Sequence, residues 1–180
     1  MRRYTDDWDE LAQREPYYAV LTEPRFLSGA LDDEQRRAFF ATGEADVERL
    51  LAIAGPAFAP RTALDFGCGV GRLTLALAAR AESVTGCDVS PRMLEIARRN
   101  AGEAPNVRFV TTLDDAAYDF ICSLIVFQHI PVREGLRLFA GLLRRLAPGG
   151  VAVIHFSLRR PGGALRRLAR RLRAAVPVLH

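Results

Sequence analysis

The sequence contains no lysine, so all 25 of its basic residues are arginines. It also lacks any unbroken apolar run of the ~18–20 residues that a transmembrane helix needs, and its acidic N-terminus is unlike a signal peptide. Cysteine is scarce: Cys68, Cys87 and Cys122 lie in apolar or glycine-rich surroundings, without the spacing of a metal site. These absences predict a cytoplasmic protein with free, buried thiols, no membrane span and no bound metal.

The arginines are unevenly distributed along the chain. Seven of them follow residue 158, where no acidic residue occurs; removing these seven leaves 18 arginines against 21 acidic residues, a net charge of about −3. A mildly acidic body makes nucleic acid an unexpected partner. Within residues 158–180 we expect a basic amphipathic helix over Gly163–Ala175, whose arginines either bind an anionic partner or, as we favour, face solvent.

The chain of 180 residues, 49% of them apolar, is long enough for one domain with a real core. We divide it into an N-terminal helical cap or lid over residues 1–60, an α/β core over 61–157 and the basic helix that follows. In the cap we expect a helix from Asp32 or Asp33 to an interruption at Gly43, and a second helix over 44–54. The aromatic residues of the first 30 positions either cover a ligand site, pack on the body, or do both: Trp8, Tyr17, Tyr18 and Phe26.

Short apolar runs alternate with helical periodicity from residue 61 onward. The predicted strands cover 63–66, 83–87, 107–110, 119–125 and 151–156, and the predicted helices cover 72–80, 91–100 and 131–146, with a turn at 147–150. Apolar runs without strict polar alternation are typical of strands buried on both faces. The pattern predicts an α/β fold with a doubly wound, mostly parallel sheet and helices on both of its faces.

A glycine-rich segment, Gly67-Cys68-Gly69-Val70-Gly71, follows the first predicted strand and precedes a helix. Glycines in such a loop permit positive φ angles and let a ligand approach the backbone closely. In a doubly wound sheet this loop lies at the carboxyl edge of the strands, where ligands bind. Asp88 ends the second predicted strand, and its carboxylate can accept hydrogen bonds from two neighbouring ribose hydroxyls. The two features together predict a site for a nucleoside-bearing cofactor.

The spacing of the glycines separates two classes of cofactor. The dinucleotide pattern is G-x-G-x-x-G, whereas here Gly67, Gly69 and Gly71 alternate and Arg72 takes the third position of that pattern. Asp65, just before the loop, is poorly placed beside a pyrophosphate and much better placed near a cationic sulfonium and an amino group. A nicotinamide-dependent oxidoreductase is therefore disfavoured.

Three segments, in order, resemble those of class I S-adenosylmethionine-dependent methyltransferases. They are the glycine-loop segment 64–74, the second-strand segment 87–94 and the segment 142–150 that leads to the fifth strand. The resemblance covers about residues 61–156 and implies a Rossmann-like core. That family normally continues to a sixth and a seventh strand, whereas this sequence stops where the sixth would begin. We therefore expect a sheet without strands 6 and 7, whose open edge allows self-association.

The resemblance also implies roles for the matched positions. Gly67 and Gly69, with the backbone around them, would face the methionine part of S-adenosylmethionine, and Asp65 would hold its amino end. Asp88 would bind the ribose hydroxyls. The full set of expected cofactor-binding residues is Asp65, Phe66, Gly67, Cys68, Gly69, Gly71, Arg72, Asp88, Val89, Met93, Leu113, Ser123 and Phe127.

Within that set, Val89 and Met93 would flank the adenine, which would also meet Leu113 or one of its two neighbours. Arg72 would approach the methionine carboxylate, and residues 123–128 would line the methyl-transfer side. His129 follows that segment and is the candidate catalytic residue, either a general base for a hydroxyl or amine or a packed histidine before Pro131.

The resemblance implies direct methyl displacement onto an acceptor. Residues 123–128 lack the Asn/Asp-Pro-Pro-aromatic motif of adenine- and glutamine-methylating subgroups, so a small-molecule acceptor is expected. The alternative is a truncated or degenerate cofactor-binding domain without turnover that serves as a partner-binding module.

Overall fold

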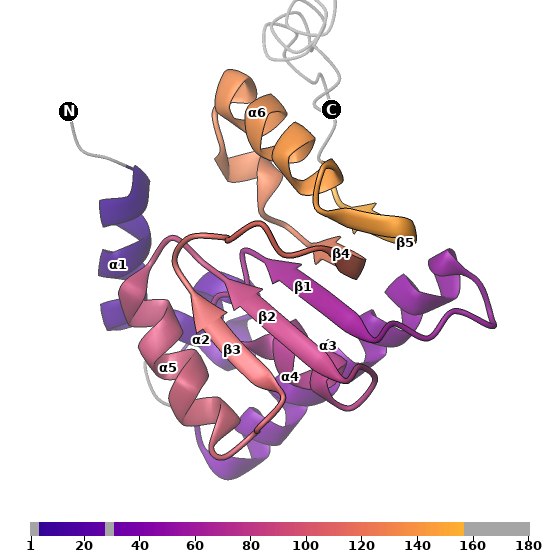
Figure 1. Ribbon diagram of the computed structural model, residues 1–180. Coiled ribbons are helices and arrows are strands. Elements are labelled where there is room, and N and C mark those ends of the chain that lie inside the picture. The colour runs from indigo at the N-terminus through magenta and orange to yellow at the C-terminus, as the bar shows by residue number, and fades with distance from the viewer. Residues whose placement is uncertain (1–3, 28–30, 157–180) are drawn as a thin grey trace, which may run out of the picture.

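The computed structural model describes residues 4–27 and 31–156 (Figure 1). Five strands in this part of the chain form one parallel sheet of order β3-β2-β1-β4-β5. The strands are β1 (Thr62–Phe66), β2 (Ser83–Cys87), β3 (Val107–Val110), β4 (Tyr118–Ser123) and β5 (Leu146–Ile154). The strand order reverses between β1 and β4, as in a Rossmann-like doubly wound sheet, and this confirms the predicted fold class.

Helices cover both faces of the sheet. They are α3 (Asp33–Ala54), α4 (Arg72–Ala78), α5 (Pro91–Ala101) and α6 (Val132–Leu143). Apolar side chains of α3 and α4 pack on one face, on a core that includes Ala63 and Phe120, while Leu138 and Leu142 of α6 pack on the other, near Leu64. Helix α5 packs beside β3. Burial of each large apolar side chain stabilises this layered arrangement by about 1.5–3 kcal/mol.

Short helices form the N-terminal cap. They are α1 (Tyr4–Arg14), α2 (Pro16–Val20) and the 3-10 turn η1 (Pro24–Phe26). Their buried residues, with Phe39 of α3, form a third apolar cluster that also contains Val70 of the glycine loop and Met93 of α5. Tyr17 and Phe26 both meet the Phe39 ring edge-on, so these aromatics pack on the body. The cap is therefore attached directly to the segment that carries the glycines.

Two of the helix starts follow from local sequence. Asp32 accepts a hydrogen bond from the Gln35 backbone N–H, and the Gln35 side chain accepts one from the Asp32 N–H, which is a complete capping box. Ser90 caps α5 through the Met93 N–H, with Pro91 in the first turn. None of the described helices is long and apolar enough to cross a membrane.

The predicted interruption at Gly43 is wrong, because α3 continues through it. A Cβ atom at this position would lie 2.3 Å from the Arg72 carbonyl oxygen. Glycine is therefore needed here so that α3 and α4 can approach each other, and it does not end the helix.

The predicted turn over residues 147–150 is also wrong. These residues belong to β5, which begins at Leu146 opposite Tyr118 and then shifts register, so that Val151 pairs with Phe120. Gly149, at a φ of 78°, lies within this irregular stretch. The residues form a bulged start to the strand, which bends its edge. The predicted C-terminal helix over 163–175 lies outside the described residues.

Candidate functional site

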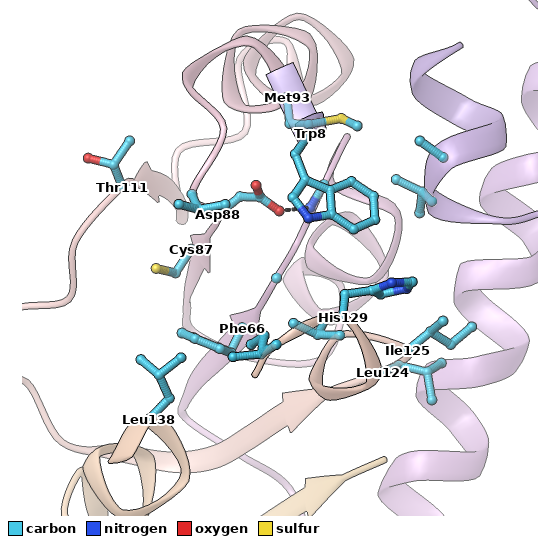
Figure 2. Close-up of a pocket in the computed structure, with 17 residues that line it drawn as sticks. Trp8, Phe66, Cys87, Asp88, Met93, Thr111, Leu124, Ile125, His129 and Leu138 are labelled. Atoms are coloured by element: carbon cyan, nitrogen blue, oxygen red, sulfur yellow. Dashed lines mark hydrogen bonds between the residues drawn. The ribbon is translucent and has the colours of Figure 1, made fainter. Parts of the chain in front are cut away.

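A cavity of about 220 Å³ lies at the carboxyl edge of the sheet (Figure 2). Seven of the predicted site residues line it: Phe66, Gly67, Gly69, Asp88, Val89, Met93 and His129. The remaining lining residues are Trp8, Ala19, Val20, Cys87, Thr111, Leu124, Ile125, Val126, Ile130 and Leu138. The lining thus combines the ends of β1, β2 and β4 with the N-terminal cap, at the position where doubly wound sheets bind ligands.

Two glycines of the loop leave no room for a side chain. Gly67 and Gly69 both have positive φ angles, 79° and 52°. A Cβ atom on Gly67 would lie 2.3 Å from Val126, and one on Gly69 would lie 2.5 Å from Val20. The loop is consequently pressed between the segment after β4 and helix α2, with its backbone facing the cavity.

Asp88 is held by two backbone N–H groups. Its Oδ2 accepts a hydrogen bond of 2.8 Å from Gly69, and its Oδ1 accepts one of 2.9 Å from Ser90. Burial raises the pKa of this carboxyl above its usual value, an effect that the two backbone hydrogen bonds oppose. Each oxygen retains acceptor capacity, so the carboxylate is already oriented for a pair of hydroxyl donors.

Helix α1 is tied to the residues that follow Asp88. Asp9 of α1 accepts a hydrogen bond from the Ser90 hydroxyl and a longer one, 3.4 Å, from the Arg92 N–H. Its negative charge lies at the N-terminus of α5, where the helix dipole favours it. This contact places Trp8, the preceding residue, over the cavity.

Trp8 packs against His129 in the cavity wall. The indole and imidazole ring centroids are 5.0 Å apart and the rings are nearly perpendicular, at 81°. His129 ends the 3-10 turn η2 (Phe127–His129), and its Nε2 lies 3.0 Å from the Gln128 amide nitrogen. Partial burial lowers the pKa of the imidazole, which favours the neutral ring at neutral pH. Of the predicted lid aromatics, Trp8 is the one that lines the cavity.

Asp65 lies beneath the cavity and not in its lining. The side chain is 1% exposed, and its Oδ2 accepts a hydrogen bond of 2.6 Å from the Thr74 hydroxyl. Burial raises the pKa of Asp65 to about 6, although Thr74 and the positive charge of Arg72 act in the opposite direction. The carboxyl thus joins the end of β1 to α4 through Thr74.

Arg72 points away from the cavity. Its side chain is 3% exposed, and its Nη1 donates hydrogen bonds of 2.7 Å to Asp46 and 3.1 Å to the Thr42 hydroxyl, both on α3. Arg72 was predicted to approach a methionine carboxylate, but its side chain does not line the cavity. Arg72 instead connects α4 to α3.

Five further predicted cofactor residues do not line the cavity: Cys68, Gly71, Leu113, Ser123 and Phe127. Ser123 donates its hydroxyl hydrogen bond to the Phe66 carbonyl, and Leu113 packs against the core. After β3, the lining residue is Thr111. The three cysteines are free and buried, as expected, and burial raises the pKa of Cys87 to about 12.

Several wall residues had no sequence signal. Val20 and Ala19 come from the cap, while Ile130 and Leu138 come from the segment that leads into α6 and from α6 itself. A resemblance confined to the core does not mark these positions. Leu124 and Val126 do fall within the stretch 123–128 that was expected to line the methyl-transfer side.

Ile125, in the same stretch, has an unusual backbone conformation. Its φ angle is 64°, the one positive value at a non-glycine residue in the described chain. A β-branched residue is strained in this region, at a cost of about 1–3 kcal/mol. Such strain persists where the surrounding structure enforces it, and here it occurs in the cavity wall.

Comparisons with known proteins agree with this geometry. Residues 63–150 match the sequence model of the family described as "Methyltransferase domain". Trans-aconitate 2-methyltransferase of Streptomyces coelicolor is 40% identical over 110 residues, which are 55% of this chain and 35% of that protein. Demethylmenaquinone methyltransferase of Tropheryma whipplei is 33% identical over 96 residues, 51% of this chain and 39% of that one. The chain thus spans well under half the length of these relatives.

Among solved structures, the N-methyltransferase NodS of Bradyrhizobium japonicum, in complex with S-adenosylhomocysteine, has a TM-score of 0.64 at 18% identity; the match covers 85% of this chain and 72% of that one. At 18% identity, the similarity to this structure is evidence about the fold alone. The fold is that of a Rossmann-like domain with a cavity at the carboxyl edge of its sheet. Residues 63–150 are thus similar to the methyltransferase-domain family, within a chain whose fold is Rossmann-like.

Proposed function

We propose that the chain binds S-adenosylmethionine in the cavity and transfers its methyl group to a small-molecule acceptor. The observation that carries the proposal is the meeting of Asp88 and the glycine loop at one cavity edge. The Asp88 carboxylate is fixed there by the Gly69 N–H, so the ribose-binding group and the loop form one unit. Residues 1–60 act as the cap of this site and residues 61–157 as its core.

The protein contributes to the reaction by aligning the cofactor with the acceptor. When bound, the cofactor provides a methyl group activated on a sulfonium. Asp88 holds the nucleoside end, and the backbone of Gly67 and Gly69 faces the remainder. The apolar side chains after β4, with Trp8, exclude water from the reacting groups. His129, at the opposite wall, accepts the proton that an acceptor hydroxyl or amine releases.

A ligand-induced shift in unfolding tests the cofactor. S-adenosylhomocysteine at ~100 times its dissociation constant should raise the free energy of unfolding by about 2.7 kcal/mol, and NAD should not. The Asp88→Ala variant should lose the effect, whereas Asp33→Ala, an exposed acid at the start of α3, should keep it. Stabilisation by NAD alone, or an undiminished effect in Asp88→Ala, contradicts the proposal. Methyl transfer in a metabolite screen then distinguishes an enzyme from the alternative, a binding domain without turnover.

A further inference from the structure

The cavity has two chemically different ends. At one end lie the Asp88 carboxylate and the backbone of the glycine loop, with Met93 and Thr111 beside them (Figure 2). At the other end, around His129, the wall is apolar and includes Leu124 and Ile125 of the segment after β4 (Figure 2). The polar end suits a nucleoside, so the apolar end remains for the acceptor.

Two aromatic rings meet where the two ends of the cavity adjoin, with the Trp8 indole drawn between Asp88 and His129 (Figure 2). Trp8 and His129 approach edge-on at 5.0 Å, and both line the cavity. An indole at such a site favours flat aromatic ligands, because stacked or edge-to-face ring pairs add about 0.5–1.5 kcal/mol to the burial of their surface. His129 is the titratable side chain on this wall among the described lining residues, and it is the group that can meet an acceptor proton.

The apolar wall also discriminates by charge. A carboxylate or phosphate placed against Leu124 and Ile125 loses its hydration, and such burial is costly without a paired cation. An uncharged ring that carries one or two hydroxyls loses far less hydration, and His129 can accept a hydrogen bond from one hydroxyl. The strained φ angle of Ile125 supports a functional role for this wall, because strained backbone conformations of this kind cluster at ligand-binding and active sites.

On the basis of the proposed function, we infer that the apolar end is an acceptor subsite for a flat, uncharged aromatic hydroxyl compound, with its ring against Trp8 and its hydroxyl toward His129. In the transfer, the hydroxyl proton passes to an imidazole nitrogen of His129. The acceptor oxygen forms a bond to the methyl carbon as the carbon–sulfur bond breaks, and that electron pair stays on sulfur. The products are an aryl methyl ether and S-adenosylhomocysteine.

Calorimetric titrations of the protein saturated with S-adenosylhomocysteine test the subsite without requiring turnover. The probes are catechol, trans-aconitate and phosphoethanolamine, which represent an uncharged aromatic hydroxyl, a carboxylate and a charged amine. Catechol should bind at least 10-fold more tightly than the other two. Equal or tighter binding of trans-aconitate or phosphoethanolamine overturns the inference.

Matched variants locate the bound ring. Trp8→Ala should weaken catechol binding at least 10-fold more than it weakens S-adenosylhomocysteine binding, whereas Tyr18→Ala, an aromatic of the neighbouring helix α2 outside the cavity lining, should change neither. Unchanged catechol binding in Trp8→Ala overturns the inference. If S-adenosylhomocysteine itself fails to bind the unmodified protein, the proposed function fails first, so the two failures are distinguishable.

Discussion

Replacing Gly43 by alanine should destabilise the protein, although the same change in an ordinary helix is stabilising. An alanine inside a helix is favoured over glycine by up to ~1 kcal/mol. At Gly43, however, the new Cβ atom would lie 2.3 Å from the Arg72 carbonyl oxygen, about 1 Å short of ordinary contact. That oxygen belongs to the backbone of α4, so the helices have to separate.

The magnitude follows from the opposing terms. Overpacking of this kind costs typically ~1–3 kcal/mol, and separation of the helices also disturbs the 2.7 Å ion pair between Arg72 and Asp46. We expect Gly43→Ala to lower the free energy of unfolding by roughly 1–2 kcal/mol after the gain in helix propensity is included.

Gly141 in α6 is the matched control. A Cβ atom there would meet only the ends of the Arg144 and Arg145 side chains, at 3.8 Å or more. Gly141→Ala should therefore raise the free energy of unfolding by roughly 0.5–1 kcal/mol. Urea unfolding followed by circular dichroism measures both variants, and the midpoints should move in opposite directions at an unchanged slope. A Gly43→Ala variant as stable as Gly141→Ala would falsify the packing argument.

Two more perturbations probe the cap and the base of the loop. Asp9→Ala removes the hydrogen bonds from Ser90 and the Arg92 N–H; it should shift the emission of Trp8, the single tryptophan, to longer wavelength and weaken S-adenosylhomocysteine binding severalfold, while Glu10→Ala should not. Unaltered emission in Asp9→Ala counts against the tether. Asp65 has its pKa raised to about 6 by burial, so its ionisation opposes folding above pH 6, and this cost fades as the pH falls toward 4. Asp65→Asn should accordingly stabilise the protein by roughly 1–3 kcal/mol at pH 8 and by much less at pH 4, as chemical denaturation at the two pH values can show; an equal gain at both refutes the linkage.

The layered core was predictable from the sequence because its signals are local. Short apolar runs mark the strands, Ser90 and Pro91 mark the start of α5, and the carboxylate at the end of β2 marks the ligand edge. Each of these depends on neighbours within a few residues. The prediction for Asp88 was of this kind, and the structure places its carboxylate beside the glycine loop.

The features that sequence reasoning missed depend on distant partners. Gly43 was interpreted as a break because glycine weakens helices locally, whereas its role is set by a carbonyl 29 positions further along the chain. Arg72 follows the glycine loop in sequence, yet the Asp46 carboxylate on α3 determines where its guanidinium lies. Likewise, residues 147–150 have turn composition, but pairing of Leu146 with Tyr118 draws them into β5.

The attachment of the cap to the cavity has a further consequence for proteolysis. Because the chain has no lysine, trypsin cleaves it only after arginine, and the exposed Arg14 and Arg25 lie on either side of helix α2. Val20 of this helix lies against Gly69. A ligand bound in the cavity therefore stabilises the same stretch of chain that must unfold locally before the protease can cut it. The rate of cleavage at these two bonds should therefore report whether the cavity is occupied, because cleavage is slow with a ligand bound and fast without one.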